Sequence, residues 1–387
     1  MEHVGMDPLR AAPGAEIVLA AVAGEPSVHV VGGAVRDALR GQVPRELDLV
    51  VEGDAVAVAR AAAGRVGGTL TAHERFGTAT VRTGDFAFDL AGARRETYDR
   101  PGALPTVELG ATLEEDLARR DFTVNAMAVS LADGRLTTWP GAREDLDNGV
   151  LRVLHDRSFA DDPTRMLRLV RYAARLEFSV DPHTEALIDP ALLETVTGDR
   201  AGNELRLLLR EPPRALELLD RYGLGRALLG ERFSVNWLTE RAGPGLLALA
   251  ASSTGTPRQA LAARLNHLGF ERQAREVIVA AVDGFERLHG HLDGSDADVW
   301  RLLRGERVET AQLLAAAGDE GARRWLDRIR HRKLSISGDD LIAGGLTGAQ
   351  VGEGLARAMV ALLDGRAPDR ESQLRAAMGS LKHGRPV

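Results

Sequence analysis

Two acidic residues separated by one position, Glu46 and Asp48, could perform chemistry together. They fall in the segment ELDLVV, whose leucines and valines predict a β-strand. Side chains two positions apart on a strand point to the same face. Neighbouring carboxylates repel each other unless a cation lies between them, and Mg²⁺ is the usual cation for oxygen ligands. Two such ions could activate an attacking hydroxyl and stabilise a leaving pyrophosphate.

A glycine pair lies just before these carboxylates. The apolar run Val28–Val31 predicts a buried strand, Gly32 and Gly33 follow it, and a helical pattern carrying Arg36 comes next. Backbone N–H groups at such a turn, together with the helix N-terminus, favour a phosphate group. The alternative is an ordinary strand–turn–helix unit followed by a solvated edge strand, because a glycine pair or an E-x-D pattern alone is common.

Three segments in order carry a more specific signal. They are GGAVRDALRG with ELDLVVEGD, then RRDFTVNAMA at Arg119–Ala128, then DDPTRMLRLVRYAARLEF at Asp161–Phe178. Together they resemble the motifs of the class II tRNA nucleotidyltransferase and bacterial poly(A) polymerase family. The resemblance covers the first half of the chain. It implies an α/β nucleotidyltransferase head with a polymerase-beta-like mixed sheet, followed by an elongated all-α neck, body and tail. We place the head at 1–150, the neck at 151–230 and the body and tail at 231–387.

The resemblance also implies roles for polar residues. Glu46 and Asp48 would hold two Mg²⁺ ions. A third carboxylate, Asp89, lies in a predicted hairpin opposite the face of Phe86, Phe88 and Leu90, where it would help the first pair or simply be a surface residue. The residues expected to bind the nucleotide are Gly32, Gly33 and Arg36 at the triphosphate, Arg119 and Arg120 in support, Asp121 and Asn125 at the ribose or local backbone, and Asp162, Arg165 and Arg168 on a helix.

Asp162 and Arg165 are three positions apart, so a helix could bring them together. A carboxylate and a guanidinium in one plane could distinguish cytosine and adenine from the other bases. The alternative is an amphipathic helix with ordinary ion pairs. Two positions depart from the family pattern: Glu46 stands where relatives usually carry Asp, and Asp161 where they carry Glu.

The segment Arg94–Gly110 is rich in charges and turn-forming residues, and we expect a long loop there. In related enzymes a loop at this place helps to switch nucleotide choice. Its sequence, YDRPGALPTVE, resembles that of A-adding and poly(A)-type relatives more than that of one-piece CCA-adding enzymes. After residue 178 the pattern predicts helices only, with a basic cluster between Arg323 and Lys333 that could contact RNA or be a solvated face.

Composition narrows the class of protein. The 387 residues suffice for two or three domains, and the absence of cysteine excludes disulfides and thiolate metal sites. No apolar run reaches the roughly 18 residues of a membrane span, and the start has no secretory signal. We therefore expect a cytoplasmic protein without a membrane partner. The net charge of −7 disfavours general nucleic-acid affinity, so RNA binding would depend on local arginine clusters.

The predicted function is addition of nucleotides to the 3′ end of tRNA, from CTP and ATP, without a nucleic-acid template. tRNA is the expected partner, and no obligate protein partner is evident. Several alternatives remain open. The enzyme could add only CC, only A, or a poly(A) tail, and a small-molecule substrate is a more distant option. The two departures from the family pattern also allow an RNA-binding module with a weakened catalytic site.

Overall fold

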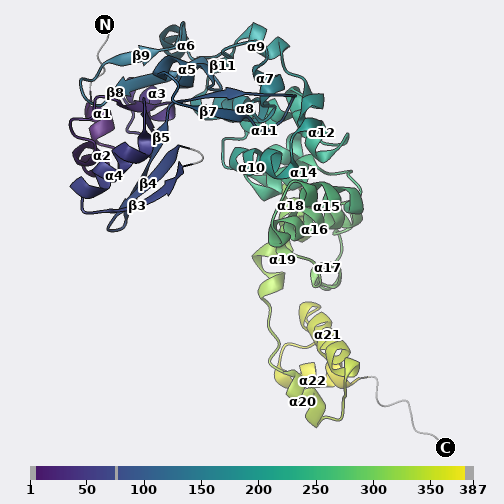
Figure 1. The fold of residues 1–387 in the computed structure, drawn as a ribbon. Helices are drawn as coiled ribbons and strands as arrows, with labels where there is room; N and C mark the ends of the chain where they lie inside the picture. The colour runs from purple at the N-terminus through teal and green to yellow at the C-terminus, as the bar shows by residue number, and fades with distance from the viewer. Residues whose placement is uncertain (1–5, 75–76, 380–387) are drawn as a thin grey trace, which may run out of the picture. The chain divides into compact units, whose positions relative to one another are not determined.

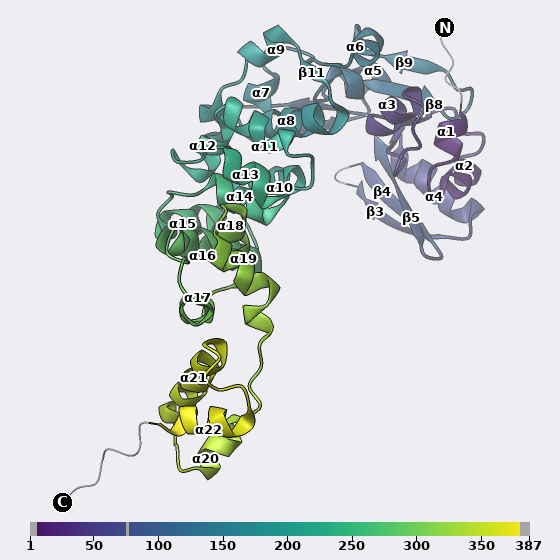
Figure 2. The same cartoon turned by 180° about the vertical axis from the view of Figure 1, so that it is seen from behind.

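The computed structural model describes residues 6–74 and 77–379. The chain forms two compact units, Met1–Leu224 and Gly225–Val387. The first unit contains every strand of the described residues and the second is built from helices (Figures 1 and 2). This arrangement confirms the expected fold class, an α/β head with a mixed sheet followed by an all-α region.

A seven-stranded sheet with the order β3-β4-β5-β2-β1-β8-β9 forms the head. Its strands are β1 (Val28–Val31), β2 (Leu49–Val51), β3 (Thr69–His73), β4 (Thr78–Thr83), β5 (Phe86–Gly92), β8 (Met127–Ser130) and β9 (Leu136–Thr138). Only β2 and β5 are parallel neighbours; the other pairs are antiparallel. Leu49 pairs with Leu90. Asp48 and Asp89 each precede one of these residues, so the register places them side by side.

The helices of the head are α1 (Asp7–Arg10), α2 (Ala15–Ala21), α3 (Gly33–Leu39), α4 (Ala55–Arg65), α5 (Leu113–Ala118) and α6 (Ala142–Asn148), with the 3₁₀ turn η2 (Thr123–Asn125). Asp54 caps the N-terminus of helix α4, where its carboxylate accepts a hydrogen bond from the N–H of Ala57 at 2.9 Å. Its buried alanines let the helix lie close to β3, β4 and β5. An aspartate just before an alanine-rich run is typical of an N-cap, so this helix start follows from the local sequence.

A central apolar cluster joins the segments that carry the predicted site. It is formed by Val31, Val50, Ala93, Leu113, Leu117, Ala126 and Ala128. These residues come from β1, β2, α5 and β8, from the residue after β5 and from the residue before β8. The glycine turn, the acidic segment and the arginine segment therefore rest on one packed base, which limits their relative movement.

The prediction of one long loop at Arg94–Gly110 is wrong. Strands β6 (Arg94–Thr97) and β7 (Thr106–Leu109) form an antiparallel ribbon, with Arg94 opposite Leu109. An ion pair between Arg95 and Glu108 at 2.7 Å links the two strands. The ribbon has no continuous apolar face, so the alternation that normally signals a strand is missing from its sequence.

Further helices follow the sheet within the first unit. They are α7 (Ser158–Asp161), α8 (Thr164–Leu176), α9 (Pro182–Ala186), α10 (Gly198–Leu208) and α11 (Arg214–Arg221), with the 3₁₀ helix η3 (Pro190–Thr195) and a short parallel pair of β10 (Val150–Leu151) and β11 (Ser179–Val180). Helix α8 packs against α10 and α11. The helix carries an apolar stripe at helical spacing, and its residues Met166, Leu169, Val170 and Ala173 are fully buried.

From Leu224 onward, all regular secondary structure in the described residues consists of helices. They are α12 (Leu224–Leu229), α13 (Trp237–Ala242), α14 (Leu246–Ser252), α15 (Arg258–His267), α16 (Arg272–Leu288), α17 (Asp296–Leu303), α18 (Val308–Ala316), α19 (Glu320–Asp327), η4 (Ile329–His331), α20 (Gly338–Ala343), α21 (Ala349–Leu363) and α22 (Arg370–Met378). One apolar cluster centres on Leu303 and Trp325, and a second on Leu341 and Ala377. Throughout residues 6–74 and 77–379, every helix is too short or too polar to cross a membrane.

Candidate active site

Glu46 and Asp48 lie directly before β2, not within it as predicted. Pro44 and the bend at Arg45 and Glu46 delay the start of the strand. The backbone of Asp48 still meets β1, because its carbonyl accepts a hydrogen bond from the N–H of Val31 at 3.0 Å. The side chains of Glu46 and Asp48 therefore lie at the start of β2, and the backbone of Asp48 is hydrogen-bonded to β1.

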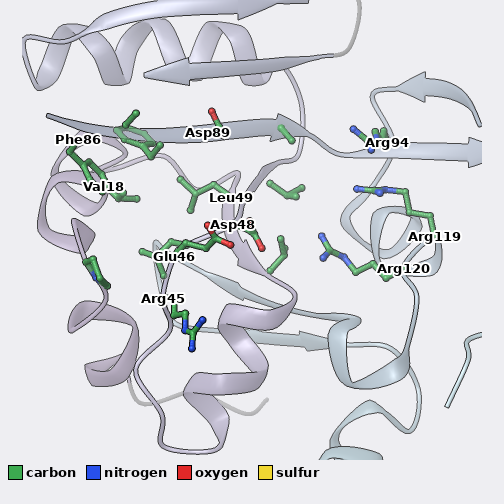
Figure 3. Close-up of a pocket in the computed structure, with 17 residues that line it drawn as sticks. Val18, Arg45, Glu46, Asp48, Leu49, Phe86, Asp89, Arg94, Arg119 and Arg120 are labelled. Carbon is green, nitrogen blue, oxygen red and sulfur yellow. The ribbon is translucent and has the colours of Figure 1, made fainter. Parts of the chain in front are cut away.

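A cavity of about 380 Å³ opens in front of these carboxylates. Its charged lining consists of Glu46, Asp48 and Asp89 together with Arg45, Arg94, Arg119 and Arg120. Figure 3 shows Glu46 and Asp48 in the middle of the lining, with Arg94, Arg119 and Arg120 grouped to one side. The site thus separates negative and positive charge across a space that could hold a nucleotide.

Burial and neighbouring charge both act on Asp48. Burial is the larger cause that raises its pKa, and the carboxylates of Glu46 and Asp89 raise it further, while Arg120 opposes them. Asp89 itself is exposed and accepts a hydrogen bond from the Thr80 hydroxyl at 2.5 Å. The interaction between these carboxylates is the electrostatic strain that a bound cation would relieve.

The donor set suits Mg²⁺. Among the residues described, there is no cluster of three or more histidine, cysteine, aspartate or glutamate side chains arranged as a complete metal cage. Mg²⁺ does not need one, since it usually takes one or two carboxylates, several waters and the phosphates of a substrate. Glu46 and Asp48 provide two hard oxygen donors of that kind beside the cavity.

The glycine turn brings backbone close to an arginine. Gly32 has φ +70°, and a Cβ atom placed there would lie 2.8 Å from Nη1 of Arg120. Only glycine fits this conformation and this approach without strain. The Nε of Arg120 is buried with no hydrogen-bond partner in the described chain, and burial lowers the pKa of Arg120. Arg120 therefore has unused donor capacity next to the turn.

Arg36 occupies a different place from the one predicted. Its side chain is 2% exposed and does not line the cavity. Its Nη1 donates to Oδ1 of Asn125 at 2.6 Å, and its Nε and Nη2 donate to Oδ1 of Asp37. The predicted contact of Arg36 with a triphosphate is therefore wrong. Arg36 instead holds α3 against η2.

A buried polar network continues from Asn125. The Nδ2 of Asn125 donates to Oδ1 of Asp121 at 2.9 Å, and Nη2 and Nε of Arg168 donate to Oδ2 of Asp121 at 2.6 and 2.8 Å. Burial by itself raises the pKa of Asp121, but Arg168 and Asn125 outweigh it and lower this pKa to about 2. Arg168 is therefore committed to Asp121, on the side of α8 that faces the head.

Asp116 orients the two adjacent arginines of the RRDFT segment. Its carboxylate is fully buried and accepts from Arg119 at 2.8 Å and from Arg120 at 3.0 Å. Arg119 also donates to Glu96 of β6 at 3.1 Å. Both arginines line the cavity. Both therefore share the cavity with Glu46 and Asp48, and Asp116 is a supporting residue that the sequence motif alone did not single out.

Asp162 and Arg165 make no ion pair with each other in the described structure, contrary to the sequence interpretation. Asp162 precedes Pro163 and has extended backbone (φ −134°, ψ 95°), so it lies outside α8 and helical spacing does not apply. Arg165 is buried and donates to Oγ of Ser158 at 2.8 Å and to the carbonyl of Arg119 at 2.7 Å. Asp162 accepts from Arg200 at 2.9 Å.

Two further arginines reach the cavity without having been predicted. Arg45 is next to Glu46, and Arg94 begins β6. The position of Arg45 could have been inferred from its neighbour, because it shares the turn with a proposed metal ligand. The position of Arg94 depends on β6 returning beside the acidic segment, which no local pattern indicated.

Comparisons with known proteins agree with this geometry. The Poly A polymerase head domain family matches residues 28–152. A multifunctional CCA protein of Chromobacterium violaceum is 32% identical over 73% of this chain and 70% of its own length. The chain belongs to the class II tRNA nucleotidyltransferase family.

Two further members show how the similarity extends. An A-adding tRNA nucleotidyltransferase of Geobacter sulfurreducens is 33% identical over 91% of this chain, which spans only 45% of that relative. The solved CCA-adding enzyme of Thermotoga maritima, complexed with tRNA, is 27% identical with a TM-score of 0.78, covering 95% of this chain and 94% of that chain. The similarity between this chain and its relatives therefore includes the helical second unit of the chain.

The buried carboxylate of Asp121 should give this family member a pH-dependent stability. Its folded pKa of about 2 is lower than the ordinary value of 3.8. The ionised form therefore stabilises the fold above about pH 4, and this contribution disappears as the pH falls toward 2. Asp121→Asn should lower the free energy of unfolding by about 2 kcal/mol at pH 7, measured by urea denaturation.

The difference between wild type and Asp121→Asn should shrink between pH 4 and pH 2. Asp147→Asn is the matched control, because Asp147 forms an exposed ion pair with Arg143 that is worth little. Equal stability of wild type and Asp121→Asn at pH 7 would show that the buried network does not depend on this charge.

Proposed function

We propose that the protein adds nucleotides to the 3′ end of tRNA from CTP and ATP, without a nucleic-acid template, and releases pyrophosphate. The observation that carries the proposal is the cavity with Glu46 and Asp48 on one part of its wall and Arg119 and Arg120 on another. The relatives support the same activity, since one is named an A-adding tRNA nucleotidyltransferase and one solved structure holds tRNA.

In this proposal the 3′-hydroxyl oxygen of the RNA attacks the α-phosphorus of the nucleotide, and the bond to pyrophosphate breaks. Glu46 and Asp48 would hold two Mg²⁺ ions, assisted by Asp89. Bound Mg²⁺ would supply charge stabilisation for the attacking and leaving oxygens. Arg119 and Arg120 would neutralise the triphosphate, beside the backbone of Gly32 and Gly33. Catalysis then consists mainly of positioning and electrostatic stabilisation.

Base choice would fall to Asp162 and Arg165 as separately held groups. The guanidinium of Arg165 donates to the carbonyl of Arg119, so a hydrogen bond connects the residue proposed at the base with a residue proposed at the triphosphate. Asp162 offers a carboxylate oxygen to an exocyclic amine, the group that cytosine and adenine share. Asp121, Asn125 and Arg168 would support this arrangement from the buried side.

We assign residues 1–150 to the catalytic head, 151–230 to the neck and 231–387 to a body and tail that bind tRNA. RNA recognition by shape and backbone suits such a helical region. The basic cluster around Arg323 to Lys333 is partly neutralised: Arg324 and Arg328 both pair with Asp296 at 3.0 Å. It supports tRNA binding less strongly than its sequence indicated.

A narrower activity is the second candidate. The A-adding relative aligns with 91% of this chain, and the β6–β7 segment resembles A-adding and poly(A)-type relatives. Addition of A alone to a tRNA ending in CC is therefore a specific alternative to complete CCA synthesis. A CC-adding enzyme, a poly(A) polymerase and a weakened RNA-binding module remain as further outcomes of one experiment.

Three tRNA transcripts ending at the discriminator base, at C and at CC decide between these activities. Each is incubated with Mg²⁺ and with CTP or ATP, singly and together, and resolved at single-nucleotide length. We expect growth by three on the shortest transcript. Growth only on the CC-ended transcript, or growth that stops at CC, identifies half of a divided pathway. Long A-ladders on unrelated RNA identify a poly(A) polymerase, and no growth on any RNA contradicts an enzymatic function.

Asp48→Ala should abolish transfer while tRNA binding persists. Removing this proposed Mg²⁺ ligand removes several kcal/mol of charge stabilisation, so the single-turnover rate should fall on the order of a thousandfold. Filter binding of labelled tRNA measures the retained affinity.

Asp85→Ala is the matched control, because Asp85 is an exposed carboxylate in the β4–β5 turn outside the cavity lining. Its transfer rate should equal that of wild type. Full transfer activity in Asp48→Ala would remove the metal assignment.

A further inference from the structure

The cavity has an apolar part that the proposed function leaves unused. Figure 3 shows Arg119 and Arg120 to one side of the proposed metal ligands. Val18 of α2 and Phe86 of β5 lie to the other side. Pro13, which comes shortly before α2, also lines the cavity. We call Pro13, Val18 and Phe86 the apolar wall.

The ring of Phe86 is held in a constrained orientation. A Cβ atom on Gly14, which has φ +73°, would overlap the tip of this ring, so the ring packs directly on glycine backbone. The ring of Phe88 lies 6.2 Å from that of Phe86 between centroids, at an interplanar angle of 29°. Phe86 is nevertheless partly exposed and lines the cavity. It can therefore offer ring surface to a nucleic-acid base with little further loss of side-chain freedom.

Arg45 differs from the other arginines of the cavity lining. Arg94, Arg119 and Arg120 each form an ion pair with a carboxylate. Arg45 is exposed and forms no ion pair within residues 6–74 and 77–379. It directly precedes Glu46, so its charge lies beside the proposed metal ligands. An unpaired guanidinium in this position suits a phosphate group, which it can bind through two N–H donors.

Transfer at phosphorus imposes a direction on the two substrates. The attacking and leaving oxygens lie roughly in line, on opposite sides of the α-phosphorus. The pyrophosphate is proposed to lie at Arg119 and Arg120, so the RNA hydroxyl has to approach from the side away from these arginines. That is the side of the apolar wall in Figure 3. A terminal nucleotide has a flat base and a 5′ phosphate, which match Phe86 and Arg45 in chemistry.

We propose that the apolar wall and Arg45 form the subsite for the 3′-terminal nucleotide of the RNA. The base stacks on Phe86 beside Pro13 and Val18, and Arg45 pairs with the 5′ phosphate of the same nucleotide. This inference rests on the proposed function, because the side of approach follows from the placement of the pyrophosphate. Stacking accepts any base, so the subsite places the attacking hydroxyl for RNA ends that differ in their last nucleotide.

The first test removes each partner of the proposed stack, in the full-length protein. We measure kcat/KM with the tRNA transcript that the wild type extends fastest, and with the same transcript made abasic at its last nucleotide. Phe86→Leu and the abasic end should each lower kcat/KM about tenfold, the scale of one base–aromatic stack. Together they should lower it no more than the larger single change, because both remove the same contact. The KM for the incoming nucleotide should not change.

The second test concerns the phosphate. Arg45→Gln should raise the KM for tRNA, and the slope of log(kcat/KM) against log salt concentration should become shallower by about 0.7, as expected for one lost contact to a single strand. Arg135→Gln is the matched control, because Arg135 is an exposed arginine just before β9 and lies outside the cavity lining. Its slope and both KM values should equal those of wild type.

Three results would overturn the inference alone, in a wild type that is active. They are an equal loss in Phe86→Leu on the intact and abasic transcripts, wild-type activity in Phe86→Leu, and a rise in the KM for the nucleotide instead of tRNA in Arg45→Gln. If the Tm of Phe86→Leu lies below the assay temperature, Arg45→Gln decides, because the side chain of Arg45 is exposed. A wild type that is inert with every transcript overturns the proposed function and, with it, this inference.

Discussion

The buried carboxylate of Asp121 is the interaction on which the first unit depends. It accepts from Arg168 on α8 and from Asn125 in η2, and Asn125 in turn accepts from Arg36 on α3. A buried charge is costly unless its partners satisfy it fully, so each member of this network constrains the others. The glycine turn, the arginine segment and the helix near the proposed base site are therefore fixed with respect to one another.

The cavity achieves its charge separation by burying counter-charges behind its wall. Asp116 is inaccessible, and it holds the guanidinium groups of Arg119 and Arg120. Glu96 supports Arg119 from the ribbon. These arginines are held in place before any ligand arrives, so little reorganisation is needed when charge enters the cavity. Arg120 acts on Asp48, but the pKa of Asp48 is still raised, so these arginines do not neutralise the carboxylates that would bind a cation.

Local signals in the sequence were reliable where one segment decides the outcome. Asp54 caps α4, and the apolar stripe of α8 is buried, because both follow from spacing along a single helix. Predictions failed where a distant segment decides. Arg36 turns toward Asn125, 89 positions away, and Asp162 pairs with Arg200 because Pro163 excludes it from α8. The β6–β7 ribbon was missed because its strands carry charge in place of an apolar face.

Because β2 and β5 are parallel neighbours, the placement of the acidic residues does not depend on the length of chain between them. Leu49 pairs with Leu90, and this backbone ladder alone sets Asp48 beside Asp89. Helix α4 and strands β3 and β4 lie between β2 and β5 along the chain, and β3 and β4 extend the sheet on the far side of β5. The chain between β2 and β5 can change in length or composition without changing the distance between the two carboxylates. The surface of the head can therefore vary in this segment while its chemistry stays the same.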